Sequence, residues 1–193
     1  MPVVISEYDP AWPKRYEAEA KRVRDTVGPL LAGLEHIGST AVPGLAAKPV
    51  IDMLAGVREA GVLSTALEKP SLLPTGEVLP AGNARHLALA HGLIGLGFAY
   101  YGENGIPGRL FFKRTEDGAS RVHLHVVLHD SELWRQHVAF RDYLRAFPAV
   151  ARQYEALKRA LARQHKTDRD AYTTGKAAFI TQCLRAADSW LQN

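Results

Sequence analysis

The feature that most constrains the fold is a pair of short apolar segments on either side of a loop of small residues. Residues 34–38, LEHIG, and residues 49–57, PVIDMLAGV, read as short strands. The connecting residues include Gly38-Ser39-Thr40 and a Pro-Gly step, which are typical of turns and loops. We therefore expect strand, loop and strand, with a single carboxylate, Asp52, inside the second strand.

Helical spacing and strand signals place most of the remaining elements. We expect a helix from Trp12 to about Gly28 and a second helix over residues 86–96, HLALAHGLIGL. Residues 98–130 read as two strands joined by a turn at residues 116–118, EDG. The C-terminal part has a helical pattern, because apolar residues recur there three or four positions apart: Val150, Tyr154, Leu157 and Leu161.

The order of these elements predicts the fold class. Thr167 followed by Asp170 resembles a capping box, so we expect a last helix to begin there and to run to about Leu191. Helix, strand, loop, strand, helix, two strands and helices predict an α+β fold, with a small mixed β-sheet flanked by helices and a helical C-terminal part. The chain has 193 residues, enough for one sizeable core and few for two. We expect one domain over 1–193, with the proline-rich segment 68–85 as a loop insertion.

Composition narrows the function classes. The single cysteine, Cys183, cannot form an internal disulfide, so we expect a cytoplasmic protein. No stretch approaches the roughly 18 uninterrupted apolar residues of a membrane span, so no membrane partner is expected. The net charge of +4 is spread through helical stretches instead of forming one basic block. This favours an anionic small-molecule ligand and argues against nucleic acid.

The loop residues Gly38, Ser39 and Thr40 follow an expected strand. Small residues let backbone N–H groups approach an anion closely, and two hydroxyls add donors, so phosphate is the natural ligand. The alternative is a tight turn that merely needs small residues. The spacings of a P-loop, of a dinucleotide-binding G-x-G-x-x-G motif and of a hydrolase G-x-S-x-G motif are absent from the sequence.

Asp52 is the sharper signal. In a strand it shares a face with Val50 and Leu54, whereas Ile51 and Met53 point the other way. A buried carboxylate is costly unless it is paired, hydrogen-bonded or bound to a cation. Asp52 therefore needs a partner, either a bound metal ion or a core-facing lysine or arginine.

A second polar strand face occurs in residues 121–127, RVHLHVV. Arg121, His123 and His125 project from one face of this strand, and apolar residues project from the other. Two imidazoles in this spacing can hold a metal ion or bind phosphate, whereas a lone histidine is more often a satisfied sheet residue. Because two polar strand faces need a common hydrated or liganded space, we expect Asp52, His123 and His125 to converge on one cleft.

Further cations are candidates for an anionic ligand, although each alone also fits a solvated or structural residue. The predicted phosphate- or nucleotide-binding set is Gly38, Ser39, Thr40, Lys48, Arg109, Lys113 and Arg121. The turn-rich segment 102–109, GENGIPGR, suits the rim of a site. The remaining histidines show no partner pattern, and we read them as surface or core residues: His86, His91, His129, His137 and His165.

Several segments of the chain resemble the GrpB family, also called the UPF0157 family. They are YDPAWPKRYEAE, EHIGSTAVPGLAAKPVIDM, GENGIPGRLFFKR, RVHLHVV and DAYTTGKAAFI, and they cover nearly the full length except the proline-rich segment. The resemblance implies a branch of the nucleotidyltransferase fold shared with polymerase-β-like enzymes. In such enzymes a Gly-Ser loop holds a triphosphate, the next strand carries two carboxylates for Mg²⁺, and a later strand supplies a further carboxylate.

The resemblance assigns roles and also shows departures. Gly38 and Ser39 match the loop and Asp52 matches the second carboxylate, whereas Val50 stands where the first belongs. The later strand corresponds to residues 121–127, where histidines replace the carboxylate. Imidazoles favour transition metals over Mg²⁺, so the implied site has changed chemistry. The metal candidates are Asp52, His123, His125 and His36.

These residues support three hypotheses. The first is a possible nucleotidyltransferase that binds a nucleoside triphosphate or related phosphate ligand with a divalent metal, Mg²⁺ or Mn²⁺ with Zn²⁺ as the alternative, and that uses Asp52 and His125 in catalysis. Its acceptor and oligomeric state are not specified by the sequence. The second is a non-catalytic nucleotide- or partner-binding module, because the family includes copies fused to dephospho-coenzyme A kinase. The third is a metal-dependent hydrolase that uses Asp52 with His123 and His125.

Overall fold

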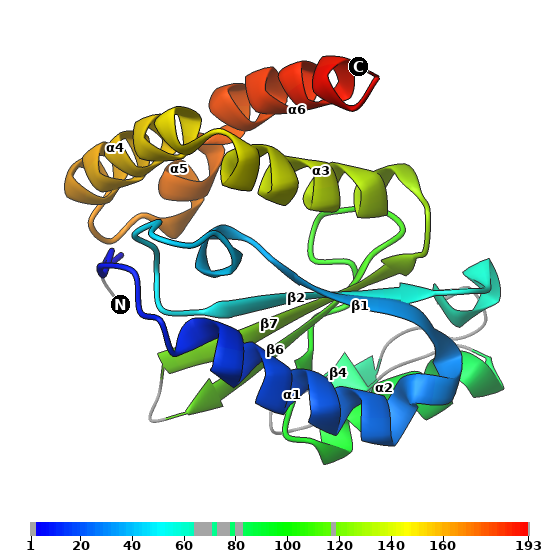
Figure 1. Ribbon diagram of the computed structural model, residues 1–193. Helices are drawn as coiled ribbons and strands as arrows, with labels where there is room; N and C mark the ends of the chain where they lie inside the picture. The colour runs from blue at the N-terminus through cyan, green and yellow to red at the C-terminus, as the bar shows by residue number, and fades with distance from the viewer. Residues whose placement is uncertain (1–2, 64–70, 73–77, 80–82, 117–118, 193) are drawn as a thin grey trace.

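The computed structural model describes residues 3–63, 71–72, 78–79, 83–116 and 119–192, and a five-stranded mixed sheet forms its centre (Figure 1). Its spatial order is β1-β2-β7-β6-β5, with β2 parallel to β7 and the other neighbours antiparallel. The strands are β1 (Leu31–Ile37), β2 (Ile51–Val57), β5 (Ala99–Tyr100), β6 (Leu110–Glu116) and β7 (Ala119–Leu128). The predicted α+β fold with a small mixed sheet flanked by helices is confirmed.

Helices cover both faces of the sheet (Figure 1). One face carries α1 (Trp12–Val27) and α2 (Ala84–Gly95), close to the bounds that the sequence predicts. On the opposite side of the sheet lie α3 (Glu132–Ala146), α4 (Pro148–Gln164), α5 (Arg169–Thr174) and α6 (Ala177–Leu191). Three 3-10 turns connect elements: η1 (Gly28–Leu30), η2 (Ser39–Ala41) and η3 (Ala60–Leu63).

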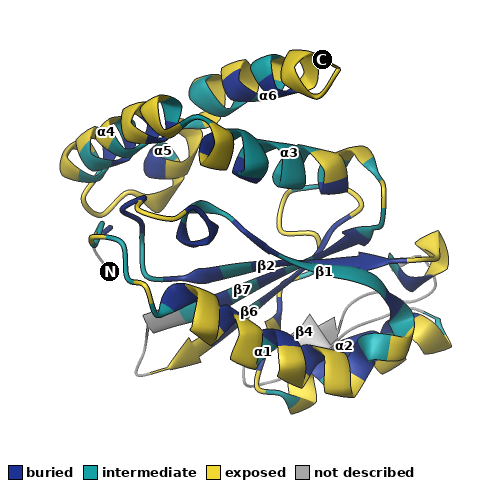
Figure 2. Ribbon diagram, in the orientation of Figure 1, coloured by how far each residue is buried: buried dark blue, intermediate teal, exposed yellow. Residues whose placement is uncertain are grey.

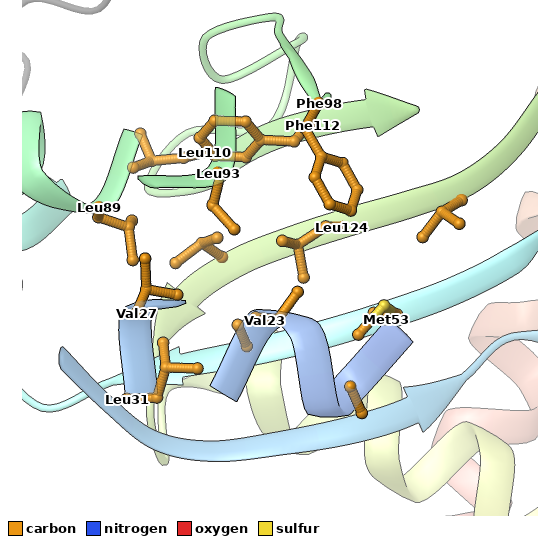
Figure 3. Close-up of a cluster of buried hydrophobic side chains, with 14 of the residues drawn as sticks. Val23, Val27, Leu31, Met53, Leu89, Leu93, Phe98, Leu110, Phe112 and Leu124 are labelled. Carbon is orange, nitrogen blue, oxygen red and sulfur yellow. The ribbon is translucent and has the colours of Figure 1, made fainter. Parts of the chain in front are cut away.

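The main core lies between the sheet and the α1–α2 layer, where the inward faces of both are buried (Figure 2). α1 buries one stripe of residues three or four positions apart: Trp12, Tyr16, Ala20, Val23 and Val27. Met53 of β2, Phe112 of β6 and Leu124 of β7 point into this layer (Figure 3). Complete burial of a side chain of this size contributes about 1.5–3 kcal/mol. The strands are therefore most stable with their apolar faces turned toward the α1–α2 layer.

The opposite face of β2 and β7 is polar at one end. The parallel register places Asp52 beside His123 and Leu54 beside His125. Side chains alternate along a strand, so these residues point away from Met53 and the α1–α2 layer. The predicted faces of Asp52, His123 and His125 are confirmed, and this polar face is turned toward the C-terminal helices. Arg121, predicted on the same face as the two histidines, lines a hollow beside α1 instead.

The last helical segment differs from the prediction. Thr167 is not its cap, because the side chain of Asp168 accepts a hydrogen bond from the backbone N–H of Ala171 at 2.9 Å. The single helix expected here is also wrong, since α5 and α6 are separate helices. At the break, a Cβ atom on Gly175 would lie 2.5 Å from Leu161, so glycine allows the chain to pass close to α4.

Two predicted features lie partly outside the described residues. Within the segment 68–85, β3 (Ser71–Leu72) pairs antiparallel with β4 (Val78–Leu79), and α2 begins at the end of the segment. At the predicted turn, Glu116 pairs with Ala119, and residues 117–118 are not described.

Among the helices of the described ranges, none is long and apolar enough to cross a membrane.

Candidate phosphate-binding site

A cleft of about 680 Å³ lies between the polar face of the sheet and helices α4 and α5. One wall consists of β2, β6, β7, the rim segment 102–109 and residues 38–50, which contain η2 and are called the η2 loop below. The C-terminal helices supply the other wall. The predicted site residues that line the cleft are Ser39, Thr40, Lys48, Asp52, Arg109, Lys113, His123 and His125. The expected convergence of the aspartate and the two histidines on one cleft is confirmed.

The charges in the cleft are strongly unbalanced. Its carboxylates are Asp52 and Asp170. Its six cationic side chains are Lys48, Arg109, Lys113, Lys158, Arg169 and Lys176. In the described part of the chain, none of these six forms a salt bridge. Cations gathered without counter-ions repel one another, so the cleft favours a ligand with several negative charges.

Asp52 has a histidine partner, not the lysine or arginine that the sequence left open. Nδ1 of His123 lies 3.0 Å from Oδ1 of Asp52, across the parallel pairing of β2 and β7. Burial alone would raise the pKa of Asp52, but the hydrogen bond and charge of His123 hold that pKa below its usual value. An ionised carboxylate can only accept, so Nδ1 of His123 donates to Asp52, and the neutral tautomer that fits this contact has its lone pair on Nε2.

His125 is held in the opposite tautomer. Nη1 of Arg109 lies 3.3 Å from Nδ1 of His125, and because a guanidinium can only donate, Nδ1 accepts and Nε2 carries the proton. Burial lowers the pKa of His125 to about 3, against the opposing charge of Asp52. His137, which the sequence left as a surface or core residue, lies against His125 with ring centroids 5.6 Å apart. The neutral imidazole of His125 therefore offers an N–H donor.

Arg109 is only partly available to a ligand. Besides its contact with His125, it donates to the carbonyl groups of Glu103 at 3.1 Å and Asn104 at 2.9 Å. Its guanidinium also lies over the ring of Phe111, 4.7 Å from the centroid. Most of its donor capacity thus holds the rim segment 102–109 against β7.

Glycine brings the η2 loop close to the carboxylate. Gly38 has a φ of 71°, and a Cβ atom there would lie 2.5 Å from Oδ2 of Asp52. Any other residue would be strained and would press on the carboxylate. The next residue, Ser39, lines the cleft, and its hydroxyl accepts a hydrogen bond from Nζ of Lys158 at 2.9 Å.

Other predicted site residues serve the fold or lie elsewhere. The hydroxyl of Thr40 donates to the carbonyl of Val50 at 3.1 Å and accepts from Nε2 of His36 at 3.0 Å. His36 lies on the α1 face of the sheet and stacks on Tyr16, with centroids 4.6 Å apart, so it is not part of the cleft. Arg121 lines a separate hollow beside α1.

The residues present do not fit a resident divalent metal ion. Across the described ranges, no three side chains of histidine, cysteine, aspartate or glutamate lie close enough to hold one. His36 faces away from Asp52, and Nε2 of His125 carries a proton where a metal ligand would need a lone pair. The four predicted metal ligands are therefore not brought together as one group.

Three cations of the cleft come from the helical part of the chain and were missing from the sequence-based set: Lys158, Arg169 and Lys176. Lys158 is 2% exposed and lies on the buried stripe of α4, four residues after Tyr154 and three before Leu161. The sequence signal that could have identified Lys158 as a site residue is its position inside an apolar helical stripe, where a lysine is unusual. Lys176 follows Tyr172 by one helical turn in the sequence, and its amine lies 4.6 Å from the centroid of that ring.

Comparisons with known proteins agree with the resemblance seen in the sequence. The family model described as GrpB protein matches residues 2–186. A UPF0157 protein of Pseudomonas aeruginosa is 39% identical over 181 residues, which cover 93% of this chain and 65% of that protein. A dephospho-CoA kinase of Mycolicibacterium paratuberculosis is 29% identical over 200 residues, covering 98% of this chain and 47% of that protein. This chain thus spans less than two thirds of the length of either relative.

A solved structure agrees over nearly the whole chain. The crystal structure of the conserved protein GrpB from Enterococcus faecalis superposes with a TM-score of 0.80 and 31% identity. The match covers 98% of this chain and 100% of that chain. By sequence model and by structure, the chain belongs to the GrpB family.

Proposed function

We propose that the cleft binds a nucleoside triphosphate or a related phosphate ligand and supports transfer of a nucleotidyl or phosphoryl group to an acceptor. The observation that carries this is the excess of basic groups: six lysine and arginine side chains face two carboxylates, and within the described residues no salt bridge compensates them. The nucleotidyltransferase likeness implied for the GrpB family supports the same class of ligand.

In the proposed complex the phosphates lie against the η2 loop and the lysines around it. Ser39 and Lys48 come from the loop, and Lys176 comes from the junction of α5 and α6. Burial and then neighbouring cations lower the pKa of Lys48, and burial also lowers that of Lys176. An anion between them offsets this repulsion, and each charge-assisted hydrogen bond contributes about 1.5–3 kcal/mol.

The histidine pair supplies acid–base chemistry in this proposal. Nε2 of His123, set by Asp52, takes the proton of the acceptor hydroxyl as the acceptor oxygen bonds to phosphorus. The leaving group, pyrophosphate in nucleotidyl transfer or the nucleoside diphosphate in phosphoryl transfer, departs with the electron pair of the broken P–O bond. The N–H of His125 and the surrounding cations stabilise the charge that develops on the transferred group. No step is assigned to a metal ion held by the protein alone.

Calorimetric titration with ATP, GTP, CTP and UTP, each with and without Mg²⁺, Mn²⁺ or Zn²⁺, tests this function. We expect at least one nucleotide to bind, and the double variant Lys48→Met/Lys113→Met to bind at least about tenfold more weakly, which is about 1.4 kcal/mol. Lys166→Met removes an exposed lysine that does not line the cleft and is the matched control. Failure of every nucleotide to bind, or equal affinity in the double variant, would disprove the function.

A non-catalytic accessory module is the second candidate, and one finding favours it. A dephospho-CoA kinase contains a region similar to this chain that accounts for about half of its length, 47%. In such a protein the phosphate-binding cleft would hold a ligand without turnover. Chromatographic assay of the bound nucleotide after long incubation distinguishes the two. An unchanged nucleotide with every acceptor tried supports the module. Formation of pyrophosphate or of the nucleoside diphosphate that depends on the acceptor and is lost in His123→Ala supports the transferase.

A further inference from the structure

Lys158 is a buried cation in a setting that suits its neutral form. It projects from α4 into the cleft and is 2% exposed. Its Nζ donates to the hydroxyl of Ser39 at 2.9 Å and to the carbonyl of Ala46. A neutral amine has two N–H groups, and these two acceptors satisfy both. The third N–H of an ammonium has no acceptor among the described residues.

The groups around this amine supply little compensating charge. They are Tyr154, Glu155 and Arg159 of α4, Tyr172 of α5 and Lys176 beyond it. The one carboxylate, that of Glu155, already accepts from the backbone N–H of Ala46 at 3.1 Å and from Nε of Arg159 at 2.9 Å. Burial, opposed by the charge of Glu155 and joined by the charges of Lys176 and Arg159, lowers the pKa of Lys158 to about 7.

We propose that Lys158 is a phosphate-binding residue that takes up a proton from solvent when a phosphate group occupies the η2 loop. This rests on the proposed function. The phosphate supplies the missing counter-ion, the amine becomes an ammonium, and its third N–H points to the ligand while the contacts with Ser39 and Ala46 are kept. Recognition of the ligand is then coupled to one protonation step, and affinity falls at alkaline pH through a lysine of the protein.

Calorimetry detects this proton directly. ATP is titrated at about pH 8.5, well above the second pKa of a phosphate group at about 6, so the ligand itself is fully ionised. At a constant Mg²⁺ concentration, the heat is compared in two buffers of different ionisation enthalpy. We expect wild type to take up most of one proton on binding and Lys158→Met to take up correspondingly less. Lys166→Met, the exposed control, should keep the wild-type uptake.

The outcomes separate this inference from the proposed function. ATP binding with no buffer dependence in wild type would overturn the role of Lys158 and leave the nucleotide site standing. Absence of ATP binding would count against the nucleotide site itself. Carbon-13 NMR of the Lys158 side chain in wild type, with and without saturating sulfate, decides the question even where Lys158→Met fails to fold. The pKa of Lys158 should rise by about two units in sulfate, and an unchanged pKa overturns the inference.

Discussion

At the scale of single residues, the tautomer of each histidine in the cleft is set by one neighbour. His123 and His125 lie on the same face of one strand, two residues apart, yet Asp52 fixes one tautomer and Arg109 fixes the other. The strand alternation predicted that the two histidines face the same cleft. It could not predict their different roles, because those depend on β2 and on the rim segment 102–109, which are distant in sequence.

The tautomers are measurable by nitrogen-15 NMR of the imidazole rings. Near neutral pH we expect His123 to be protonated on Nδ1 and His125 on Nε2, because their partners can respectively only accept and only donate. Asp52→Ala should remove the preference of His123 and leave that of His125 unchanged. Finding the Nε2 proton on both rings of wild type would show that Asp52 does not orient His123.

At the scale of elements, local patterns predicted most of the sheet and the helices but not their junctions. α1 and α2 lie close to their predicted bounds, because the helical spacing of apolar residues can be recognised within each segment alone. The division of the last segment into α5 and α6 depends on the close approach of Gly175 to Leu161. His36 was a metal candidate because it lies beside the Gly-Ser loop in the sequence. The face on which its side chain lies depends on the antiparallel register of β1 with β2, which the local pattern does not give.

The η2 loop provides a matched pair of glycines. Gly38 and Gly44 both have positive φ, 71° and 77°, so a side chain at either is strained; at Gly38, where ψ is −173°, this backbone strain is about 1–3 kcal/mol. Only at Gly38 does the added Cβ meet Asp52, since nothing lies within 4 Å at Gly44. We expect urea unfolding to show a greater loss of stability in Gly38→Ala, and its ATP affinity to fall while Gly44→Ala binds normally. Equal effects of the two substitutions would mean that the loop does not depend on its approach to Asp52.

At the scale of the whole molecule, buried neutral histidines make stability depend on pH. Burial lowers the pKa of His36 to about 4 and that of His125 to about 3, whereas an unfolded histidine titrates near about 6.5. Below about pH 6.5 the unfolded chain therefore binds protons that the folded chain does not, so stability falls as the pH drops toward 4. For His36 alone the loss at pH 5 is about 2 kcal/mol.

Urea unfolding at about pH 7 and about pH 5 measures this loss. His36→Phe keeps a ring that can stack on Tyr16 and removes the titrating group, so the difference between the two pH values should shrink in that variant. A wild-type stability that is the same at both pH values would show that these histidines are not held neutral in the folded protein.

The contact between Ser39 and Lys158 joins residues 119 positions apart. During synthesis the Gly-Ser loop and both strands of the Asp52–His123 pair leave the ribosome well before α4 and the junction that carries Lys176. A ribosome-bound or truncated chain can thus present the sheet half of the cleft without the lysines that complete it. The cleft is complete only after α4 and this junction have also been made, so a phosphate ligand that binds the complete cleft stabilises the folded protein over chains that lack these lysines.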